Sequence, residues 1–75
     1  MSDREPAFVR LEILEERDNS LHILQRQARE TELSVWIPRS QLEHISKKGK
    51  LPNGNMEAEI EMPEWLAEAK GLDYK

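Results

Sequence analysis

The chain has 75 residues, no cysteine and a formal net charge of -4. A chain of this length has room for a single domain, and without cysteine neither a disulfide framework nor a Cys-ligated zinc ion can stabilise it. Residues 1–6 lack the apolar run of a signal peptide, and no stretch approaches the roughly 20 apolar residues of a membrane span. We therefore expect a cytoplasmic protein without a membrane partner.

Charge is distributed unevenly along the chain. Residues 1–37 carry five basic and eight acidic groups, residues 38–55 carry four and one, and residues 56–75 carry two and six. Although 35% of the residues are charged, apolar side chains recur at regular spacings, which a disordered chain lacks. We expect one folded domain over residues 1–75, with residues 1–6 flexible.

The first half of the chain predicts three strands. Apolar and charged residues alternate over residues 7–16, and this period of two is typical of a half-buried strand. The turn-forming residues 18–20 then favour a hairpin, so residues 21–24 should pair antiparallel with the first strand. Residues 31–37 alternate most clearly and predict the third strand.

Residues 38–55 are expected to hold a short helix and a loop. Pro38 lacks an amide hydrogen and ends the third strand, and Ser40 followed by Glu43 matches the capping box that opens a helix. Lysine, glycine, proline and asparagine dominate residues 47–55, so we expect the longest loop and the most mobile part of the chain there.

Residues 56–62 alternate again, which predicts a fourth strand with its glutamates on one side. A proline and a glutamate then suit the first turn of a helix over residues 63–70. Gly71 followed by Leu72 matches a left-handed C-terminal cap with an apolar contact. We expect Trp65 to pack in the core.

Together these elements predict an α+β fold, an antiparallel four-stranded sheet with the element order β-β-β-α-β-α. Four large apolar residues lie on the face opposite the main apolar rows: Phe8, Leu14, Leu24 and Trp36. The sheet therefore needs cover on both sides. Two solutions stay open: the sheet curls into a small barrel like an SH3 fold, or it pairs with another copy of the chain.

A row of carboxylates is the first candidate site. Glu57, Glu59 and Glu61 project from one face of the fourth strand, and Glu64 and Glu68 continue the acidic surface onto the helix. Carboxylates at this spacing repeat every 6.6 to 6.8 Å, roughly, along a strand, so they can imitate the phosphates of a nucleic acid and meet a basic cleft. The alternative is a solvated strand face that discourages edge pairing.

A basic set is the second candidate site, for contact with nucleic acid. It consists of Trp36, Arg39, Lys47, Lys48 and Lys50. The lysines and the arginine can contact phosphates, and the tryptophan can stack on a base. The loop itself contains no aromatic residue, and the net negative charge repels DNA, so the sequence favours the acidic surface.

Nothing in the sequence predicts catalysis or cofactor binding. We recognise neither a nucleophile beside a base nor two carboxylates across a cleft. His22 is expected on a strand face and His44 on an exposed helix turn, without further ligands at metal-binding spacing. We therefore predict a protein that is not an enzyme, with no catalytic residue, no metal site and no cofactor.

The C-terminal half of the chain resembles small proteins of tailed bacteriophages and prophages. The resemblance rests on the sequence WIPRSQ at residues 36–41 and PEWLAEAKGL at residues 63–72. In physical terms these are a strand end with a cap and a capped helix, so they encode a fold and carry no catalytic residue. The resemblance implies a gene among phage recombination and replication genes, or a small acidic protein that blocks a host defence complex.

Two classes of function follow. The first is a non-enzymatic phage or mobile-element accessory protein that binds another protein, such as an anti-CRISPR-like inhibitor of a host defence complex acting through its acidic surface. The second is an accessory nucleic-acid-binding module in phage recombination or replication. The sequence is compatible with a homodimer in either class.

Overall fold

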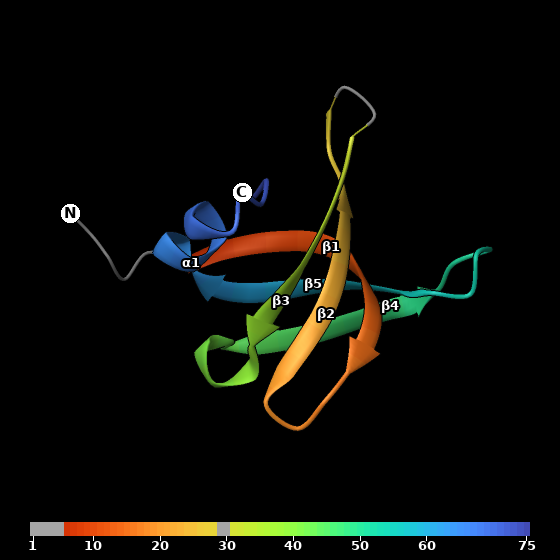
Figure 1. Ribbon diagram of the computed structural model, residues 1–75, viewed down its shortest axis with the longest axis horizontal. Helices are drawn as coiled ribbons and strands as arrows, with labels where there is room; N and C mark the ends of the chain where they lie inside the picture. The colour runs from red at the N-terminus through yellow and green to blue at the C-terminus, as the bar shows by residue number, and fades with distance from the viewer. Residues whose placement is uncertain (1–5, 29–30) are drawn as a thin grey trace.

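The computed structural model describes residues 6–28 and 31–75, which form an antiparallel sheet and a short helix (Figure 1). The strands are β1 (Pro6–Glu16), β2 (Ser20–Arg26), β3 (Glu32–Pro38), β4 (His44–Lys50) and β5 (Met56–Pro63), and the helix is α1 (Glu64–Ala69). A short 3-10 helix, η2 (Arg39–Gln41), follows β3. The strand order is β3-β2-β1-β5-β4, so among the described residues β3 and β4 are the two edges of an open sheet.

The expected hairpin of β1 and β2 is confirmed. Odd-numbered side chains of β1 from Ala7 to Ile13 are buried, as the period of two predicts. Residues 12–16 of β1 pair antiparallel with residues 21–24 of β2, and the register shifts between Ile13 and Glu15.

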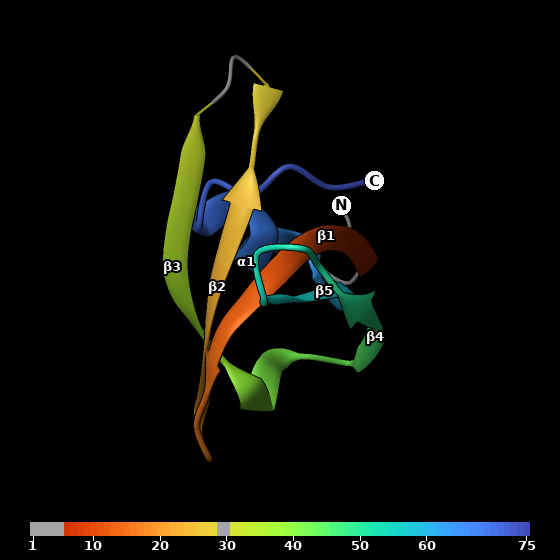
Figure 2. The ribbon, with the colours of Figure 1, turned by 90° about the vertical axis from the view of Figure 1, so that its right-hand side faces the viewer.

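The sheet bends sharply because β1 is shared between two arms (Figure 2). Residues 6–13 of β1 pair with β5, whereas residues 12–16 pair with β2. One arm therefore holds β2 and β3, and the other holds β5 and β4. Figure 2 shows α1 lying between the two arms, where it covers the inner face of the sheet.

The core consists of apolar side chains from four strands, from α1 and from residue 72. Its members are Ala7, Val9, Leu11, Ile13, Leu21, Ile23, Ile37, Ala58, Ile60, Met62, Leu66, Ala67 and Leu72. The alternation predicted for residues 31–37 and 56–62 is thus confirmed, because the apolar rows of β3 and β5 face inward.

The end of α1 is the left-handed cap that the sequence predicts. Gly71 has a φ of 76°, and its amide donates to the Glu68 carbonyl over 3.1 Å. The Leu72 amide donates to the Ala67 carbonyl over 2.8 Å, and the Leu72 side chain is buried. This bonding pattern satisfies the last carbonyls of the helix and directs residues 72–75 back toward β1.

The prediction of a four-stranded sheet is wrong, because the segment expected to be a helix and a loop contains a fifth strand. The capping box does not form: η2 is capped by Pro38 without a side-chain hydrogen bond. His44 begins β4 and does not lie on a helix turn. Residues 47–50, expected in a loop, continue β4 beside β5, so only residues 51–55 form the turn. The sequence did not predict β4 because three lysines and a glycine interrupt the alternation of apolar and polar residues, as is common on edge strands.

Of the two solutions that the sequence left open, the small barrel is wrong, because β3 and β4 do not pair and the sheet stays open. Helix α1 covers the inner face instead, with Leu66 and Ala67 buried. Trp65, expected in the core, is instead 48% exposed. The flexibility expected of residues 1–6 concerns mainly residues 1–5, which lie outside the described residues, whereas Pro6 begins β1.

Candidate binding surface

The acidic row, which consists of Glu57, Glu59 and Glu61, lies on the outer face of β5. β5 is the middle strand of one arm of the sheet. In the pairing of β5 with β1, Glu61 is opposite Phe8 and Glu59 is opposite Arg10. Because β4 pairs with the other side of β5, the backbone of the row is fixed on both sides. β5 is therefore not an edge strand, so these glutamates do not protect an edge. A solvated strand face without a partner stays the alternative to a binding role.

Two cations approach the acidic row, both at long range. Arg10 Nη1 lies 3.8 Å from a carboxylate oxygen of Glu57, and Lys48 Nζ lies 3.9 Å from one of Glu59. The side chains of Glu57 and Glu59 are each 33% exposed. Exposed pairs of this kind contribute at most about 1 kcal/mol, so the carboxylates stay available to another cation.

Glu64 and Glu68, the helical part of the predicted acidic surface, hold residues 72–75 in place. The Tyr74 hydroxyl lies within hydrogen-bond distance of both carboxylates, 3.0 Å from Glu64 and 2.6 Å from Glu68, and can donate its one hydrogen to either. The hydrogen bond to Glu68, followed by desolvation and by Glu64, raises the pKa of the Tyr74 hydroxyl well above its usual range. Glu64 and Glu68 thus have a structural partner. Glu61 lies between Phe8 and His44, and among the described residues no ion pair or side-chain hydrogen bond reaches its carboxylate.

The predicted basic set is dispersed over β3, η2 and β4, and its charges are partly neutralised. Arg39 Nη1 and Lys47 Nζ lie 3.5 and 3.0 Å from the two carboxylate oxygens of Glu16. The hydrogen bond from Lys47 is the main cause that lowers the pKa of Glu16, with Arg39 adding to it against the effect of desolvation. Lys48 faces Glu59, and Lys50 is exposed at the end of β4.

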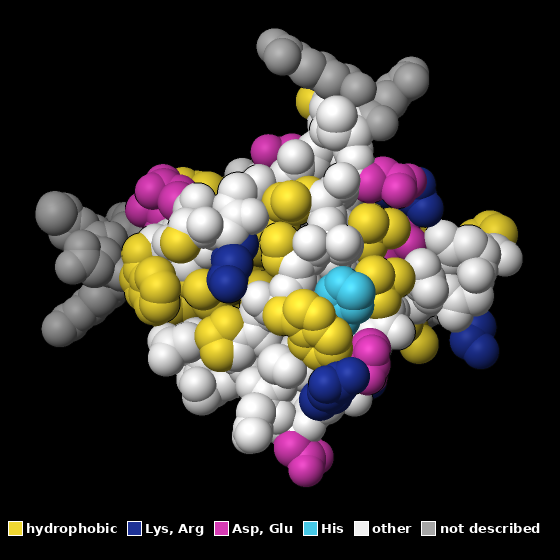
Figure 3. Space-filling model, viewed as in Figure 1, with side chains coloured by type: hydrophobic (Ala, Val, Ile, Leu, Met, Phe, Trp, Pro, Cys, Tyr) yellow, Lys and Arg dark blue, Asp and Glu magenta, His cyan; other side chains and the backbone are white. Residues whose placement is uncertain are grey.

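Trp36 lies on the outer face of β3 in a stack of side chains. The His22 ring, opposite it on β2, lies 4.6 Å from the Trp36 ring between centroids with an angle of 10° between the planes. The Arg17 guanidinium lies 4.8 Å from the centroid of the same indole. Figure 3 shows a histidine beside a hydrophobic patch, with Lys or Arg atoms at the far margin of that patch. The indole face is therefore already used by neighbours within the chain.

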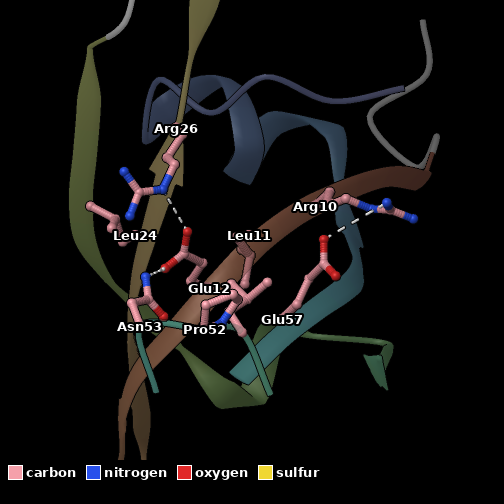
Figure 4. A pocket seen from close by; sticks show the side chains of 9 residues that line it. Arg10, Leu11, Glu12, Leu24, Arg26, Pro52, Asn53 and Glu57 are labelled. Atoms are coloured by element: carbon pink, nitrogen blue, oxygen red, sulfur yellow. Dashed lines mark hydrogen bonds and ion pairs between the residues drawn. The ribbon is translucent and has the colours of Figure 1, made fainter. Parts of the chain in front are cut away.

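A hollow on the outer face, which the sequence did not predict, lies where β1 and β2 separate (Figure 4). It has a volume of about 430 Å³. Its lining residues are Arg10, Leu11, Glu12, Leu24, Arg26, Leu51, Pro52, Asn53 and Glu57. Figure 4 shows Arg10 and Arg26 on opposite sides of the hollow, with Glu12 between them. A second hollow of about 440 Å³ shares Arg10 and Arg26 and extends to residues 73–75.

Glu12 is the central polar group of the first hollow, and only 7% of the residue is exposed. Its carboxylate accepts hydrogen bonds from Arg26 Nε over 2.8 Å and from the side-chain amides of Asn53 and Asn55 over 3.1 Å each. Burial by itself raises the pKa of Glu12, but these hydrogen bonds outweigh it and hold the pKa below its usual value. Glu12 therefore fixes the β4–β5 turn onto the sheet.

Among residues 6–28 and 31–75, no three His, Cys, Asp or Glu side chains gather closely enough to hold a metal ion. Within the same residues, no helix has the length and apolar character needed to cross a membrane.

No family model, curated protein or solved structure matches this chain. Residues 6–28 and 31–75 form a small open antiparallel sheet that is covered by a short helix and has an acidic row on the outer face of β5.

Proposed function

We propose that this chain is a non-enzymatic binding protein that docks the outer face of β5 onto a basic surface of another protein. The observation that carries the proposal is the row of Glu57, Glu59 and Glu61, which lie on one face of a strand paired on both sides. Because the backbone of β5 is held by two neighbours, the spacing of the carboxylates is set before a partner arrives. Preorganisation of this kind reduces the entropy lost on binding.

The charges around the row favour a cationic partner. Arg10 and Lys48 approach only to 3.8 and 3.9 Å, and such weak exposed pairs exchange readily with cations from elsewhere. A row of like charges on one face also attracts an oppositely charged surface before contact and so increases the association rate.

The spacing of the row supports a partner surface that otherwise holds nucleic acid. Alternate residues of a strand are separated by about 6.6 to 6.8 Å, so the carboxylates form a linear array of negative charge like that of a phosphate backbone. The resemblance of residues 36–41 and 63–72 to tailed-phage accessory proteins favours a nucleic-acid-processing complex, such as a host defence complex that the chain inhibits in the bacterial cytoplasm.

The test is capture from nuclease-treated bacterial lysate on three immobilised forms of the chain. The wild type is compared with a triple variant, Glu57→Gln, Glu59→Gln and Glu61→Gln, and with a control, Glu15→Gln, Asp18→Asn and Glu43→Gln, which removes three exposed charges elsewhere. We expect proteins that are retained by the wild type and the control, lost by the triple variant and displaced by added double-stranded DNA. Equal retention on all three forms would rule out the acidic row as the surface that binds the partner.

The second class of function, a nucleic-acid-binding module, requires that the chain itself binds DNA. Arg39 and Lys47 share Glu16, and Trp36 is stacked against His22, so three of the five members of the basic set have close neighbours within the chain. We expect no change in tryptophan fluorescence when single-stranded DNA is added at low salt. Binding at low salt that weakens steeply as salt rises would favour the module instead.

A further inference from the structure

The outer edge of β3 is a surface that the proposed function does not use. Among the described residues, β3 pairs with β2 on one side and with no strand on the other. Figures 1 and 2 show β3 as the outermost strand of its arm. An edge strand presents unpaired amide and carbonyl groups that can pair with another chain.

The hydrogen bonds at both ends of β3 identify which residues point outward. The Gln27 amide donates to the Thr31 carbonyl over 2.8 Å, and the Arg39 amide donates to the Asn19 carbonyl over 3.0 Å. Residues 31 and 39 thus bond toward β2. Because the bonding direction alternates along an antiparallel strand, residues 33, 35 and 37 also bond toward β2. The backbone groups of residues 32, 34 and 36 therefore face the free edge.

The two edges of the sheet differ in how well they are protected. On β4, three lysines and a register shift between Lys47 and Gly49 oppose the addition of a strand. On β3, the pairing with β2 is regular over the whole strand, and Glu32 is its only charged residue. Proline appears only at the last position, Pro38. β3 therefore lacks the features that usually block an edge.

We propose that β3 pairs antiparallel with β3 of a second copy of this chain, across a two-fold axis at Ser34. In this register Ser34 lies opposite Ser34 of the second copy, and Glu32 lies opposite its Trp36. The outward backbone groups of residues 32, 34 and 36 then form about six hydrogen bonds between the copies. Two five-stranded sheets become one continuous sheet with an isologous interface.

The side chains are self-complementary in this register. Ser34, which is small, uncharged and exposed, lies at the axis and causes no repulsion there. On the outer face, Glu32, which pairs with Arg26 of its own chain, lies opposite Trp36 of the second copy. Arg17 of that copy pairs with Glu15 and lies 4.8 Å from the centroid of this indole, so the acidic and basic charges that meet at this position are balanced. On the inner face, partly buried Leu33 lies opposite the partly buried Val35 of the second copy. The interface therefore joins apolar to apolar and acidic to basic groups.

The dimer and the proposed partner site are independent. In the strand order, β2 and β1 separate β3 from β5, so a dimer leaves both acidic rows open. Loss of the dimer therefore does not predict loss of partner binding, and failure of either proposal can be recognised separately.

Sedimentation velocity over a range of protein concentrations tests the dimer. Variants that introduce a charge at residue 34 test whether the two-fold axis lies there. We expect the wild type to dimerise, whereas Ser34→Lys and Ser34→Glu, which place like charges opposite each other, should each raise the dissociation constant at least tenfold. An equimolar mixture of the two variants should dimerise again. The control Ser46→Lys, on the opposite edge strand β4, should dimerise like the wild type. Circular dichroism verifies that each variant is folded.

The proposal is overturned if the folded wild type stays monomeric at every concentration, or if Ser34→Lys associates as strongly as the wild type. Cross-linking tests the register, because the chain has no cysteine of its own. Directly opposed residues have Cα atoms about 5.5 Å apart, a distance that a disulfide can span. Ser34→Cys should oxidise to a covalent dimer at least tenfold faster than Ser46→Cys, and equal rates would contradict an axis at Ser34.

Discussion

The hydrogen bonds of single side chains join parts of this chain that are distant in sequence. The partners of the Glu12 carboxylate lie 14, 41 and 43 residues further along the chain. Through them a buried group on β1 contacts both β2 and the β4–β5 turn. A carboxylate with so little exposure is stable in its charged form only because several donors compensate its lost hydration.

Replacing Glu12 by glutamine should lower the free energy of unfolding by about 1 to 2 kcal/mol, since the charge that Arg26 and the two asparagines compensate is removed. Urea denaturation at pH 7 measures the change. The matched control is Glu15→Gln, whose carboxylate pairs with Arg17 at an exposed position and should change the free energy by less than about 0.5 kcal/mol. Equal effects of the two substitutions would contradict the role assigned to Glu12.

At the scale of the elements, a side chain completes the sheet where two strands separate. β2 leaves β1 beyond the pairing of Glu12 with Leu24. The Gln25 side-chain amide then donates to the backbone carbonyls of Arg10 and Asp73, over 3.1 and 2.8 Å, and accepts from the Asp73 amide over 2.7 Å. Gln25 thus substitutes for a missing stretch of backbone between β1 and residues 72–75.

The variant Gln25→Leu keeps a buried side chain of similar size but removes these hydrogen bonds. It leaves the backbone groups of Asp73 unsatisfied, so the free energy of unfolding should fall by about 2 kcal/mol. The Phe8 and Lys75 amides, which donate to each other's carbonyls over 3.1 Å, should exchange their hydrogens faster. Urea denaturation and amide exchange are the measurements, with the exposed Gln41→Leu as control. Unchanged exchange at Phe8 in the Gln25 variant would refute this role.

For the whole molecule, two carboxylates of β1 connect the arms of the sheet and make its stability depend on pH. Glu12 joins β1 to β2 and to the β4–β5 turn, and Glu16 joins β1 to η2 and β4. Both have a pKa below the ordinary value in the folded chain. The folded state therefore binds fewer protons than the unfolded state in weak acid, and stability falls as the pH falls.

We expect this contribution to be complete above the unfolded pKa of about 4.3 and to disappear as the pH falls through the lower folded values. Melting temperatures measured from pH 7 to pH 2 give the profile. In the double variant Glu12→Gln and Glu16→Gln the decrease below about pH 5 should be shallower than in the wild type. The control Glu15→Gln and Glu43→Gln should keep the wild-type slope. An identical slope in the first double variant would contradict the assignment.

The sequence by itself determined the elements whose pattern is local. Alternation placed Val9, Ile37 and Ile60 inward, and the left-handed cap at Gly71 followed from a glycine and an apolar residue in adjacent positions. The same alternation put the glutamates of β5 on the outer face. These features depend on neighbours within a few residues, so a single sequence contains the information.

Only the tertiary structure decided which strands meet and which polar groups are buried. β4 has few apolar residues because it is an edge with one solvated face, and its strand character comes from pairing with β5. The donors around Glu12 and the contacts of Gln25 come from segments that the chain brings together only on folding. Interactions across such sequence distances depend on the path of the whole chain, and for that reason no local pattern of residues encodes them.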